Sequence, residues 1–321
     1  MKINTVVIGA GPGGYAAAIR LAQLGIETVI VEKEYFGGVC LNVGCIPSKA
    51  MIHAAKTYSK ILNEASSMGI TTSKVDLDFA KTIAWKDDIV KKLTGGIRSL
   101  LKANKVQILE GSAKFTGPNS LKVIAANGES QSIEFKNCIL ATGSSPTRVP
   151  ALPVDQKLVL DSTGALSLPK LPSKLVIVGG GYIGLELGMA YAKMGTKVTI
   201  VEFLDQILAS FDDEVIKLMS RKLKKLGVKV FTRTKATGVA KKGQGITLTI
   251  ESAEGIQQIE ADHVCVCVGR TPTTEGLSLK TAGIELDEKG FVKVNTKLQT
   301  SAGHIYAIGD VAGQPMLAHK A

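Results

Sequence analysis

The sequence predicts an α/β protein built from two similar three-layer domains, and three observations support this fold class. A short β-branched run, a glycine-rich turn and an alanine-rich helical segment follow one another at the N-terminus, and the same succession returns near residue 175. Strands that alternate with helices in this way are typical of parallel sheets covered by helices. A proline-rich connection separates the two copies, with Pro146, Pro150, Pro153, Pro169 and Pro172.

The length and composition agree with a globular chain of two domains. At 321 residues, with 45% hydrophobic residues and 34 glycines, it exceeds one ordinary domain and is rich in tight turns. No apolar run reaches the roughly 20 residues that cross a bilayer, and the first predicted strand leaves no room for a leader peptide. We therefore expect a cytoplasmic protein without a membrane partner, in a compartment where cysteine pairs are more often catalytic than structural.

The net charge of +11 raises the question of nucleic-acid binding. The basic residues, however, mostly alternate with apolar positions on predicted helices, which is typical of a solvated face. Aromatic residues make up only 5% of the chain and provide few surfaces for base stacking. We expect no nucleic-acid partner.

The first glycine-rich turn has the features of a dinucleotide-binding turn. It lies between a strand predicted at residues 5–8 and a helix. Gly9 makes the tight turn, Gly11 lets the backbone approach a pyrophosphate, and Gly14 allows the helix to pack closely on the strand. The next strand ends at Glu32, whose carboxylate can accept a hydrogen bond from a ribose hydroxyl. Together these features predict a Rossmann-like nucleotide site.

The second glycine-rich turn repeats the first. Gly179, Gly181 and Gly184 follow a strand predicted at residues 175–178, and Glu202 ends the next strand at the same spacing as in the first copy. Two such turns predict two nucleotide sites. A carboxylate at Glu202 pairs with a free ribose 2′-hydroxyl and repels a 2′-phosphate, so the second site favours NAD over NADP.

The rest of the chain continues the alternation of strands and helices. We expect helices from residue 48 and over residues 85–101 and 212–225; strands at 106–109, 120–125, 132–135, 138–141, 197–201, 228–232 and 264–268; and hairpin turns at Asn127 with Gly128, near Gly243 and near Gly255.

The segment at residues 37–49, GGVCLNVGCIPSK, carries the residues suited to chemistry. Cys40 and Cys45 lie in a glycine-rich loop that can bring their Cα atoms within the roughly 4.4–6.8 Å of a disulfide. Cys45 stands just ahead of the helix predicted from Ser48, whose N-terminus favours a thiolate. A zinc site would require further ligands at short spacing, and none follows. The pair predicts a redox-active disulfide, with two buried structural cysteines as the alternative.

Three further cysteines have a different setting. Cys265 and Cys267 are two residues apart on a predicted strand and therefore point to one face. We predict that they pack in the core, as does Cys138.

Two loops end predicted strands with residues suited to a ligand. Residues 141–146, ATGSSP, are small and allow a backbone to lie close to a bound group, and Asp310 follows a strand through a glycine, where it could bind a polyol hydroxyl. Each pattern alone is also typical of an ordinary exposed loop.

Taken together, these segments resemble the pyridine nucleotide-disulfide oxidoreductase family, and most closely its members that oxidise protein-bound dihydrolipoamide. The resemblance rests on CLNVGCIPSK at residues 40–49, the two spaced glycine turns, ATGSSP at 141–146, VGRTP at 268–272, AIGD at 307–310 and PMLAHKA at 315–321. These segments span the chain in the family's order.

The resemblance implies two Rossmann-like domains, with an NAD-binding domain at residues 148–276 inserted into an FAD-binding domain at 1–147 and 277–321. Glu186 matches the family glutamate that pairs with Lys49. The implied FAD-binding residues are Gly9, Gly11, Gly14, Glu32, Lys49, Ala113, Thr142, Gly143, Asp310 and Ala318. The implied NAD-binding residues are Gly179, Gly181, Gly184, Glu202, Ala236 and Gly269.

The resemblance also implies an activity and a partner. A dihydrolipoyl group would attack a disulfide between Cys40 and Cys45 at Cys40, Cys45 would lie nearer the flavin, and the electrons would leave as NADH. The lipoyl group would belong to an acyltransferase or carrier protein of a 2-oxo acid dehydrogenase or glycine cleavage complex. Full-length family members form homodimers.

The chain departs from the family at its C-terminus. Family members continue for roughly another domain, about 100–150 residues, which forms the dimer interface and supplies a histidine–glutamate acid-base pair. None of His53, His263, His304 and His319 lies in the family's His-x-His-Pro context. We therefore expect that the C-terminal interface domain is absent and that dihydrolipoamide oxidation is weak, because general acid-base catalysis typically contributes about 10²–10⁴-fold. Residual flavin-dependent NADH oxidation by artificial acceptors is expected.

Two alternatives remain from the sequence. Reductases for glutathione or mercuric ion share the cysteine spacing. They commonly use NADPH, however, whereas Glu202 favours NAD. Glutathione reductases usually have Pro-Lys-Lys where this chain has Pro47, Ser48 and Lys49. The chain could also be a non-catalytic nucleotide-binding fragment.

Overall fold

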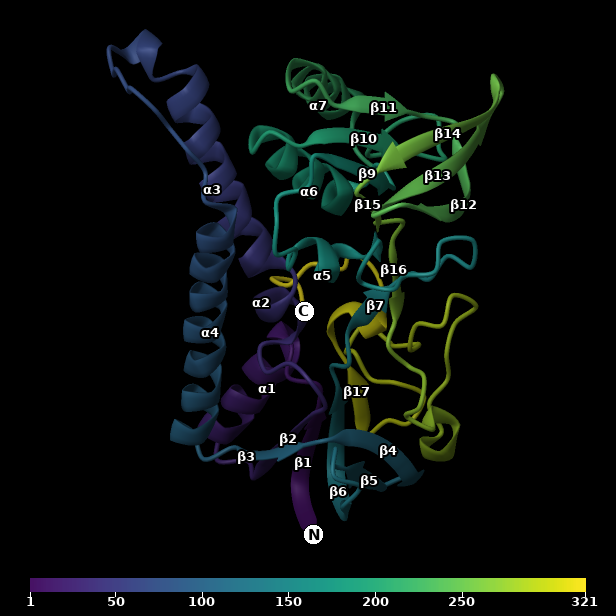
Figure 1. Cartoon of the computed structure of the whole chain (residues 1–321). Coiled ribbons are helices and arrows are strands. Elements are labelled where there is room, and N and C mark those ends of the chain that lie inside the picture. Colours follow the sequence, from purple (N-terminus) through teal and green to yellow (C-terminus); the bar gives the residue numbers. More distant parts are fainter. The chain divides into compact units, whose positions relative to one another are not determined.

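The computed structural model describes residues 1–321 and divides into two compact units. Unit 1 contains residues 1–42, 90–145 and 270–321, and unit 2 contains residues 43–89 and 146–269. Each unit is organised around a mostly parallel β-sheet (Figure 1). None of the helices combines the length and the apolar character that crossing a membrane requires.

This division differs from the expected one in the placement of residues 43–89. They belong to unit 2 because the long helix α3 (Cys45–Asn63) packs against α6 (Tyr182–Lys193). Met51 and Ala55 of α3 are buried in the same hydrophobic core as Tyr191 of α6. The chain passes between the units at residues 42–43, 89–90, 145–146 and 269–270.

The sheet of unit 1 has seven strands: β1 (Lys2–Ile8), β2 (Thr28–Glu32), β3 (Gln107–Glu110), β4 (Ser112–Gly117), β5 (Ser120–Ile124), β6 (Ser130–Leu140) and β17 (Ile305–Ala307). The strands run in the order β3-β2-β1-β6-β5-β4, with β17 on the free length of β6. Pairing is parallel from β3 to β6 and on to β17, and antiparallel through β5 and β4. α1 (Pro12–Gln23) connects β1 to β2 in the predicted way.

The sequence-based prediction was wrong about β6, for which two separate strands were expected, and it omitted β4. The polar pair Lys136 and Asn137 suggested a break. In the structure β6 runs through them, because its residues 134–140 pair with β1, while residues 130–134 pair with β5 and residues 138–140 pair with β17. The predicted hairpin turn at Gly128 is confirmed, with φ +86°.

Unit 2 contains a five-stranded parallel sheet in the order β11-β10-β9-β15-β8 and a three-stranded antiparallel sheet in the order β12-β13-β14. The strands are β8 (Val159–Leu160), β9 (Lys174–Val178), β10 (Lys197–Val201), β11 (Lys229–Phe231), β12 (Lys235–Lys242), β13 (Gly245–Ser252), β14 (Gly255–Ala261) and β15 (His263–Val266). The turns predicted near Gly243 and Gly255 connect β12, β13 and β14, and both glycines have positive φ. Two short strands outside these sheets, β7 (Ser144–Pro146) and β16 (Arg270–Pro272), pair with each other.

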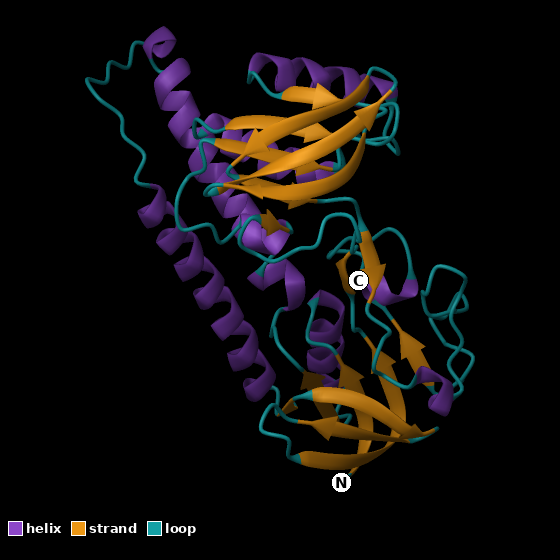
Figure 2. Cartoon of the chain, turned by 45° about the vertical axis from the view of Figure 1, so that its right-hand side comes forward, coloured by secondary structure: helices purple, strands orange, loops and turns teal.

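The helices α3 and α4 (Phe79–Ala103) extend further than the sequence indicated, and Figure 2 shows them as two long helices. α3 begins at Cys45 and not near Ser48, and residues 38–42, expected as loop, form the short helix α2 (Gly38–Asn42). The remaining helices are α5 (Ser162–Ala165), α7 (Asp213–Lys225) and the 3₁₀ helices η1 (Ser66–Met68), η2 (Leu279–Ala282) and η3 (Gly309–Ala312).

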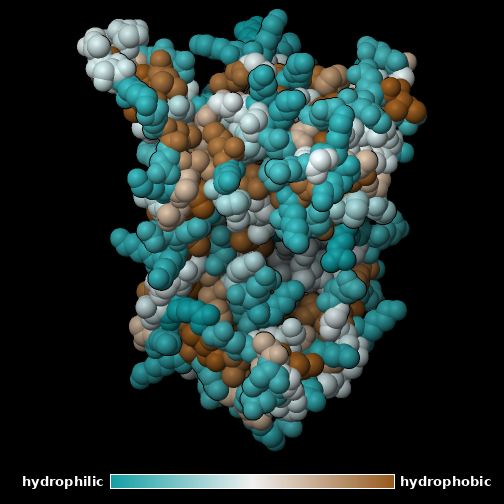
Figure 3. All heavy atoms as spheres, in the orientation of Figure 1, coloured by the Kyte–Doolittle hydropathy of each residue, from teal (hydrophilic) through white to brown (hydrophobic).

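The basic residues have the exposed positions that their spacing predicts. On α7, Ile216 and Leu223 are buried, whereas Lys217, Arg221 and Lys224 are exposed. In the face seen in Figure 3, hydrophilic residues are spread over most of the surface, with hydrophobic residues between them.

Candidate functional site

The first glycine-rich turn has a backbone geometry that only glycine fits. Gly9 has φ +102°, and a Cβ atom there would lie 2.2 Å from the carbonyl oxygen of Ala141. A Cβ atom at Gly14 would lie 1.9 Å from the carbonyl oxygen of Gly9. Gly11 is the extended N-cap of α1, followed by Pro12 in the first turn of the helix. The turn therefore brings the start of α1 against the end of β6.

Glu32 closes this turn from the end of β2. Its Oε2 accepts a hydrogen bond from the Ala10 N–H (2.7 Å), and its Oε1 accepts from the N–H groups of Glu34 (2.9 Å) and Tyr35 (3.1 Å). An ionised carboxylate has about four acceptor positions, so one remains for a ligand hydroxyl.

The second turn, in unit 2, has the same close approaches between glycines and carbonyl oxygens as the first turn. Gly179 has φ +109°, and a Cβ atom there would lie 2.4 Å from the carbonyl oxygen of Cys267; at Gly184 it would lie 2.3 Å from the carbonyl oxygen of Gly179. Glu202 Oε2 accepts a hydrogen bond from the Gly180 N–H (2.5 Å). The identical spacing in the sequence thus reflects identical local structure.

Both turns suit the pyrophosphate of a dinucleotide. The N-caps of α1 and α6, Gly11 and Gly181, have no side-chain capping hydrogen bond, and neither helix has an acidic residue in its first turn. The backbone N–H groups and the positive end of each helix are therefore left to an anionic ligand. With an acid closing each turn, the residues present fit two dinucleotides.

The cysteine segment docks directly on the first turn. The Gly37 N–H donates a hydrogen bond to the Ala10 carbonyl oxygen (2.8 Å). Gly38 has φ +65°, and a Cβ atom there would lie 2.5 Å from Gly11 Cα. Asn42 Nδ2 donates to the carbonyl oxygens of Phe36 and Gly38, both at 2.9 Å, and so holds α2 in place. Gly38 therefore allows a contact with Gly11 that a side chain at this position would block.

Cys40, on α2, lies beside α1. The pKa of the Tyr15 phenol on α1 is raised, first by burial and second by the charge of the Cys40 thiolate. Because such an effect requires proximity, it places Cys40 next to the helix that begins at the first turn.

Cys45 is the first residue of α3, after the N-cap Gly44. Ser48 donates two hydrogen bonds at this helix start, from its N–H to the Gly44 carbonyl oxygen (3.0 Å) and from Oγ to the Cys45 carbonyl oxygen (3.0 Å). The first turn contains no acidic residue, so no carboxylate of this turn offsets the positive helix end beside the thiol. The shift of the helix start to Cys45 strengthens this effect relative to the expectation.

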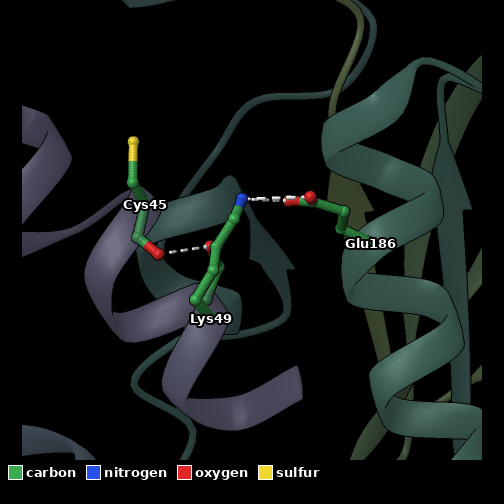
Figure 4. Close-up of polar contacts among 4 residues, drawn as sticks. Cys45, Lys49 and Glu186 are labelled. Atoms are coloured by element: carbon green, nitrogen blue, oxygen red, sulfur yellow. Dashed lines mark hydrogen bonds and ion pairs between the residues drawn. The ribbon is translucent and has the colours of Figure 1, made fainter. Parts of the chain in front are cut away.

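Lys49 lies one helical turn after Cys45 on α3 (Figure 4). Its ammonium donates to both carboxylate oxygens of Glu186 on α6, at 3.0 and 2.8 Å. The Lys49 side chain is 58% exposed and that of Glu186 33% exposed, so the pair adds less than about 1 kcal/mol to stability. Its effect is to orient the Lys49 ammonium.

Asp310 belongs to a network that includes two residues the sequence reasoning missed. Ser144 Oγ donates to Asp310 Oδ2 (2.5 Å), and Arg270 donates to Ser144 from Nε to Oγ (2.7 Å) and from a terminal nitrogen to the carbonyl oxygen (2.5 Å). Both residues lie in segments that the resemblance had used, ATGSSP and VGRTP. Their polar side chains among small residues were the available signal.

Thr142 and Gly143 follow β6 beside the first turn. Thr142 Oγ1 donates to the Thr273 carbonyl oxygen (2.7 Å), and the Thr273 N–H donates to the Gly143 carbonyl oxygen (2.9 Å). Gly143 has φ +69°. These bonds fix the loop that contacts Gly9 through Ala141.

Ala113 and Ala318 lie in segments that reach the first turn through neighbouring residues. Ala113 is buried on β4, and the Gly111 N–H before this strand donates to the Glu32 carbonyl oxygen (2.8 Å). Ala318 is half-buried in the last stretch of the chain, where the Ala321 carbonyl carbon lies 3.1 Å from the Cβ position of Gly13.

Ala236 and Gly269 have a similar relation to the second turn. Ala236 is on β12, two residues after Thr234, whose N–H donates to the Glu202 carbonyl oxygen (2.9 Å). Gly269 accepts a hydrogen bond from the Thr147 N–H (3.0 Å) and follows Cys267, which contacts Gly179.

The chain belongs to the pyridine nucleotide-disulphide oxidoreductase family, whose sequence pattern matches residues 3–321. Its relatives include the dihydrolipoyl dehydrogenases of Geobacillus stearothermophilus and Bacillus subtilis (strain 168), each 48% identical over 100% of this chain and 68% of the relative. The mitochondrial dihydrolipoyl dehydrogenase of Pisum sativum is 45% identical over 99% of this chain and 64% of the relative.

Solved structures agree with this membership. LpdA from Mycobacterium tuberculosis matches with a TM-score of 0.91 at 28% identity, covering 99% of this chain and 70% of the other. The Cu(II) complex of the HOCl-induced flavoprotein disulfide reductase RclA from Escherichia coli matches with a TM-score of 0.87 at 29% identity, covering 100% and 68%. The chain is a flavin-dependent disulfide oxidoreductase of a family that uses FAD and NAD.

Proposed function

We propose that this chain oxidises protein-bound dihydrolipoamide and delivers the electrons to NAD⁺. The observation that supports this most strongly is the docking of the cysteine segment on the first nucleotide turn, through Gly37 with Ala10 and Gly38 with Gly11. The 48% identity to dihydrolipoyl dehydrogenases over the whole chain favours this substrate over glutathione or mercuric ion.

The two turns would hold different cofactors. FAD would be held by Gly9, Gly11, Gly14, Glu32, Lys49, Ala113, Thr142, Gly143, Asp310 and Ala318. NAD would be held by Gly179, Gly181, Gly184, Glu202, Ala236 and Gly269. Residues 1–147 and 277–321 would form the FAD domain and residues 148–276 the NAD domain. Bound FAD would supply the two-electron chemistry that links a dithiol to nicotinamide.

The cysteine pair would perform the thiol–disulfide exchange. A substrate thiolate attacks Sγ of Cys40 in a disulfide between Cys40 and Cys45, a mixed disulfide forms, and Cys45 leaves as the thiolate. The second substrate thiol then attacks the mixed disulfide and releases Cys40. The substrate loses two electrons and two protons, and the cysteine pair gains the electrons. The helix N-terminus at Cys45 stabilises the leaving thiolate.

Lys49 would place its ammonium, oriented by Glu186, near the flavin. A fixed positive charge there stabilises negative charge that develops during electron transfer. Since the ion pair contributes little to stability, its proposed role is to hold the Lys49 ammonium in this orientation.

The partner we propose is a lipoyl-bearing acyltransferase or carrier protein of a 2-oxo acid dehydrogenase or glycine cleavage complex. The cytoplasm is the location we propose, because a catalytic cysteine pair is typical of a reducing compartment.

Three histidines of the chain have other partners. His263 Nδ1 contacts the Lys157 carbonyl oxygen (2.8 Å), His304 Nε2 contacts the Pro118 carbonyl oxygen (2.9 Å), and the His53 ring lies beside Trp85. None of the four histidines lies in the family's His-x-His-Pro context, and for a polypeptide of these 321 residues we propose that thiol deprotonation is slow and that electron transfer from NADH to dyes exceeds dihydrolipoamide oxidation.

Steady-state assays of the flavin-loaded chain test the proposal. We expect NAD⁺ reduction by dihydrolipoamide above the rate with glutathione, and a faster NADH-dependent reduction of a dye. A glutathione or mercuric-ion rate above that with lipoamide would overturn the substrate assignment, and a colourless protein that FAD cannot reconstitute would overturn the whole proposal.

Replacing Ser144 by alanine should weaken FAD retention. The change leaves Asp310 Oδ2 without its buried hydroxyl donor and removes an acceptor of Arg270, which costs about 1–3 kcal/mol, or about 5- to 150-fold in FAD affinity. The ratio of flavin to protein absorbance after gel filtration measures the loss. Ser145→Ala is the matched control, because Ser145 is exposed and its hydroxyl forms a hydrogen bond with the Thr273 hydroxyl, outside the network of Asp310. Equal flavin content in both variants would contradict the role of the network.

The second site should prefer NADH to NADPH by at least about tenfold in kcat/KM for dye reduction. Glu202 would repel a 2′-phosphate, and residues 203–206 offer no basic side chain to pair with it. Glu202→Gln should reduce the preference by removing the negative charge while keeping an acceptor. An unchanged preference in that variant would show that Glu202 does not select the cofactor.

A further inference from the structure

Unit 2 contains a second pair of thiols, apart from Cys40 and Cys45. Cys265 is fully buried in β15, and Cys267 follows one residue after the end of this strand, partly exposed. Because the two residues are two apart, their side chains point to the same face of the sheet. Their Sγ atoms are 3.5 Å apart, in direct contact.

This pair forms part of the second nucleotide turn. The Cys267 N–H donates to the Val178 carbonyl oxygen (2.7 Å), immediately before Gly179. The Cys267 carbonyl oxygen fills the position where Gly179 would have a Cβ atom, and Cys267 Cβ lies 3.5 Å from the Cβ position of Gly184. The glycine turn and the Cys267 backbone are therefore packed without free space between them.

The two thiols differ in solvent exposure, and this difference sets the order in which they react. Cys265 has no solvent exposure, and the pKa of its thiol is raised well above the usual value, first by the hydrogen bond with Cys267 and second by burial. Cys267 is reachable from solvent. An oxidant therefore meets Cys267 first, and the Cys265 thiol, already in contact, is placed to react next.

We propose that Cys265 and Cys267 are an oxidative modification site, which hydrogen peroxide converts to a disulfide that weakens nucleotide binding at the second turn. In the first step the Cys267 sulfur attacks the peroxide, the O–O bond breaks, and a sulfenic acid and water form. In the second step the Cys265 sulfur attacks the sulfenic sulfur, the S–O bond breaks, and the disulfide and a second water form. The two thiols together lose two electrons to the peroxide.

The coupling to the turn follows from the distances. A disulfide bond is about 2.05 Å long, so closing it from 3.5 Å requires one residue to move. Cys265 is held on both sides by parallel pairing, with Ile177 of β9 and Leu160 of β8. Cys267 lies past the end of β15 and is the residue that moves, and its carbonyl oxygen then shifts against Gly179.

Formation of the disulfide is tested in the full chain with Cys40→Ser and Cys45→Ser. Cys138, Cys265 and Cys267 are the cysteines that remain in this variant. After hydrogen peroxide treatment, iodoacetamide under denaturing conditions should alkylate Cys138 alone, and peptide mass mapping should join Cys265 to Cys267. Adding Cys267→Ser or Cys267→Val should abolish the disulfide, and adding Cys138→Ala should leave it. Alkylation of all three cysteines after peroxide would overturn the proposal.

The binding part rests on the proposed NAD site at the second turn. In the same background, peroxide should raise the Kd for NADH at least tenfold, dithiothreitol should restore it, and bound NADH should slow disulfide formation in return, because coupling is reciprocal. If the reduced protein and the disulfide form bind NADH equally, the proposed effect of the disulfide on NADH binding is wrong. If the reduced protein binds no NADH, the proposed nucleotide site is wrong, while the disulfide assay still tests the modification site by itself.

Discussion

Replacing Cys45 by serine should lower dihydrolipoamide oxidation by at least about 10³-fold while FAD stays bound, because the exchange needs a disulfide between Cys40 and Cys45, and neither cysteine can form it alone. Cys40→Ser should have the same effect for the same reason. The measurement is kcat/KM for NAD⁺ reduction by dihydrolipoamide, with flavin content determined on the same samples. NADH-dependent dye reduction, which needs no thiol, should continue in both variants.

Cys138→Ala is the matched control for these substitutions. Cys138 is fully buried in the core of unit 1, burial raises the pKa of its thiol, and it has no part in the proposed exchange. Its replacement should leave kcat/KM within about twofold of the unmodified chain. Dihydrolipoamide oxidation above a tenth of the normal rate in Cys45→Ser would exclude the proposed exchange between Cys40 and Cys45.

Replacing Gly9 or Gly179 by alanine should separate the two nucleotide sites. Each glycine has a positive φ angle, which strains alanine by about 1–3 kcal/mol, and each new Cβ atom would lie within 2.4 Å of a carbonyl oxygen. Because this oxygen belongs to the backbone in both cases, the turn must deform. We expect Gly9→Ala to lose FAD, and Gly179→Ala to keep FAD and weaken NADH binding at least about 100-fold.

Two glycines with a similar backbone and open surroundings provide the controls. Gly25 has φ +76° and Gly195 has φ +106°, and no atom lies within 4 Å of their Cβ positions. Gly25→Ala and Gly195→Ala therefore introduce the backbone strain of a positive φ angle without a collision between the new Cβ atom and a carbonyl oxygen. Both variants should keep FAD and NADH binding. Loss of both cofactors in Gly179→Ala would contradict the assignment of separate sites to the two turns.

The two nucleotide turns were the part of the structure that the sequence predicted best. Their geometry depends on residues close together in the chain: a strand, three glycines and an acid at fixed spacing. The local agreement between Gly9 and Gly179, and between Glu32 and Glu202, shows that the same spacing produces a similar backbone in both copies.

The start of α3 was predicted less well because of Pro47. A proline interrupts a helix only when it lies beyond the first turn, where its missing N–H and its ring disturb an existing hydrogen bond. Here Pro47 is the third residue of α3 and belongs to the first turn, so the helix begins at Cys45. The short α2 spans five residues, too few for a helical period to be visible in the sequence.

The network around Asp310 could not be found from local patterns. Ser144 and Arg270 are 126 residues apart, and Ser144 and Asp310 are 166 residues apart. Only the folding of unit 1 brings them together, because the chain leaves this unit at residue 145 and returns at residue 270. The pairing of Lys49 with Glu186 was anticipated through the family resemblance, and not from any pattern in the residues themselves.

The account depends on electron exchange between the cysteine pair, anchored on the first turn through Gly37 and Gly38, and a flavin held at that turn. An anaerobic titration of the FAD-loaded chain with dihydrolipoamide, followed by visible absorbance, tests it most directly. We predict a long-wavelength absorbance band from a thiolate against oxidised flavin after one equivalent, absent in Cys45→Ser. Bleaching of the flavin without this band, or the same band in Cys45→Ser, would contradict the account.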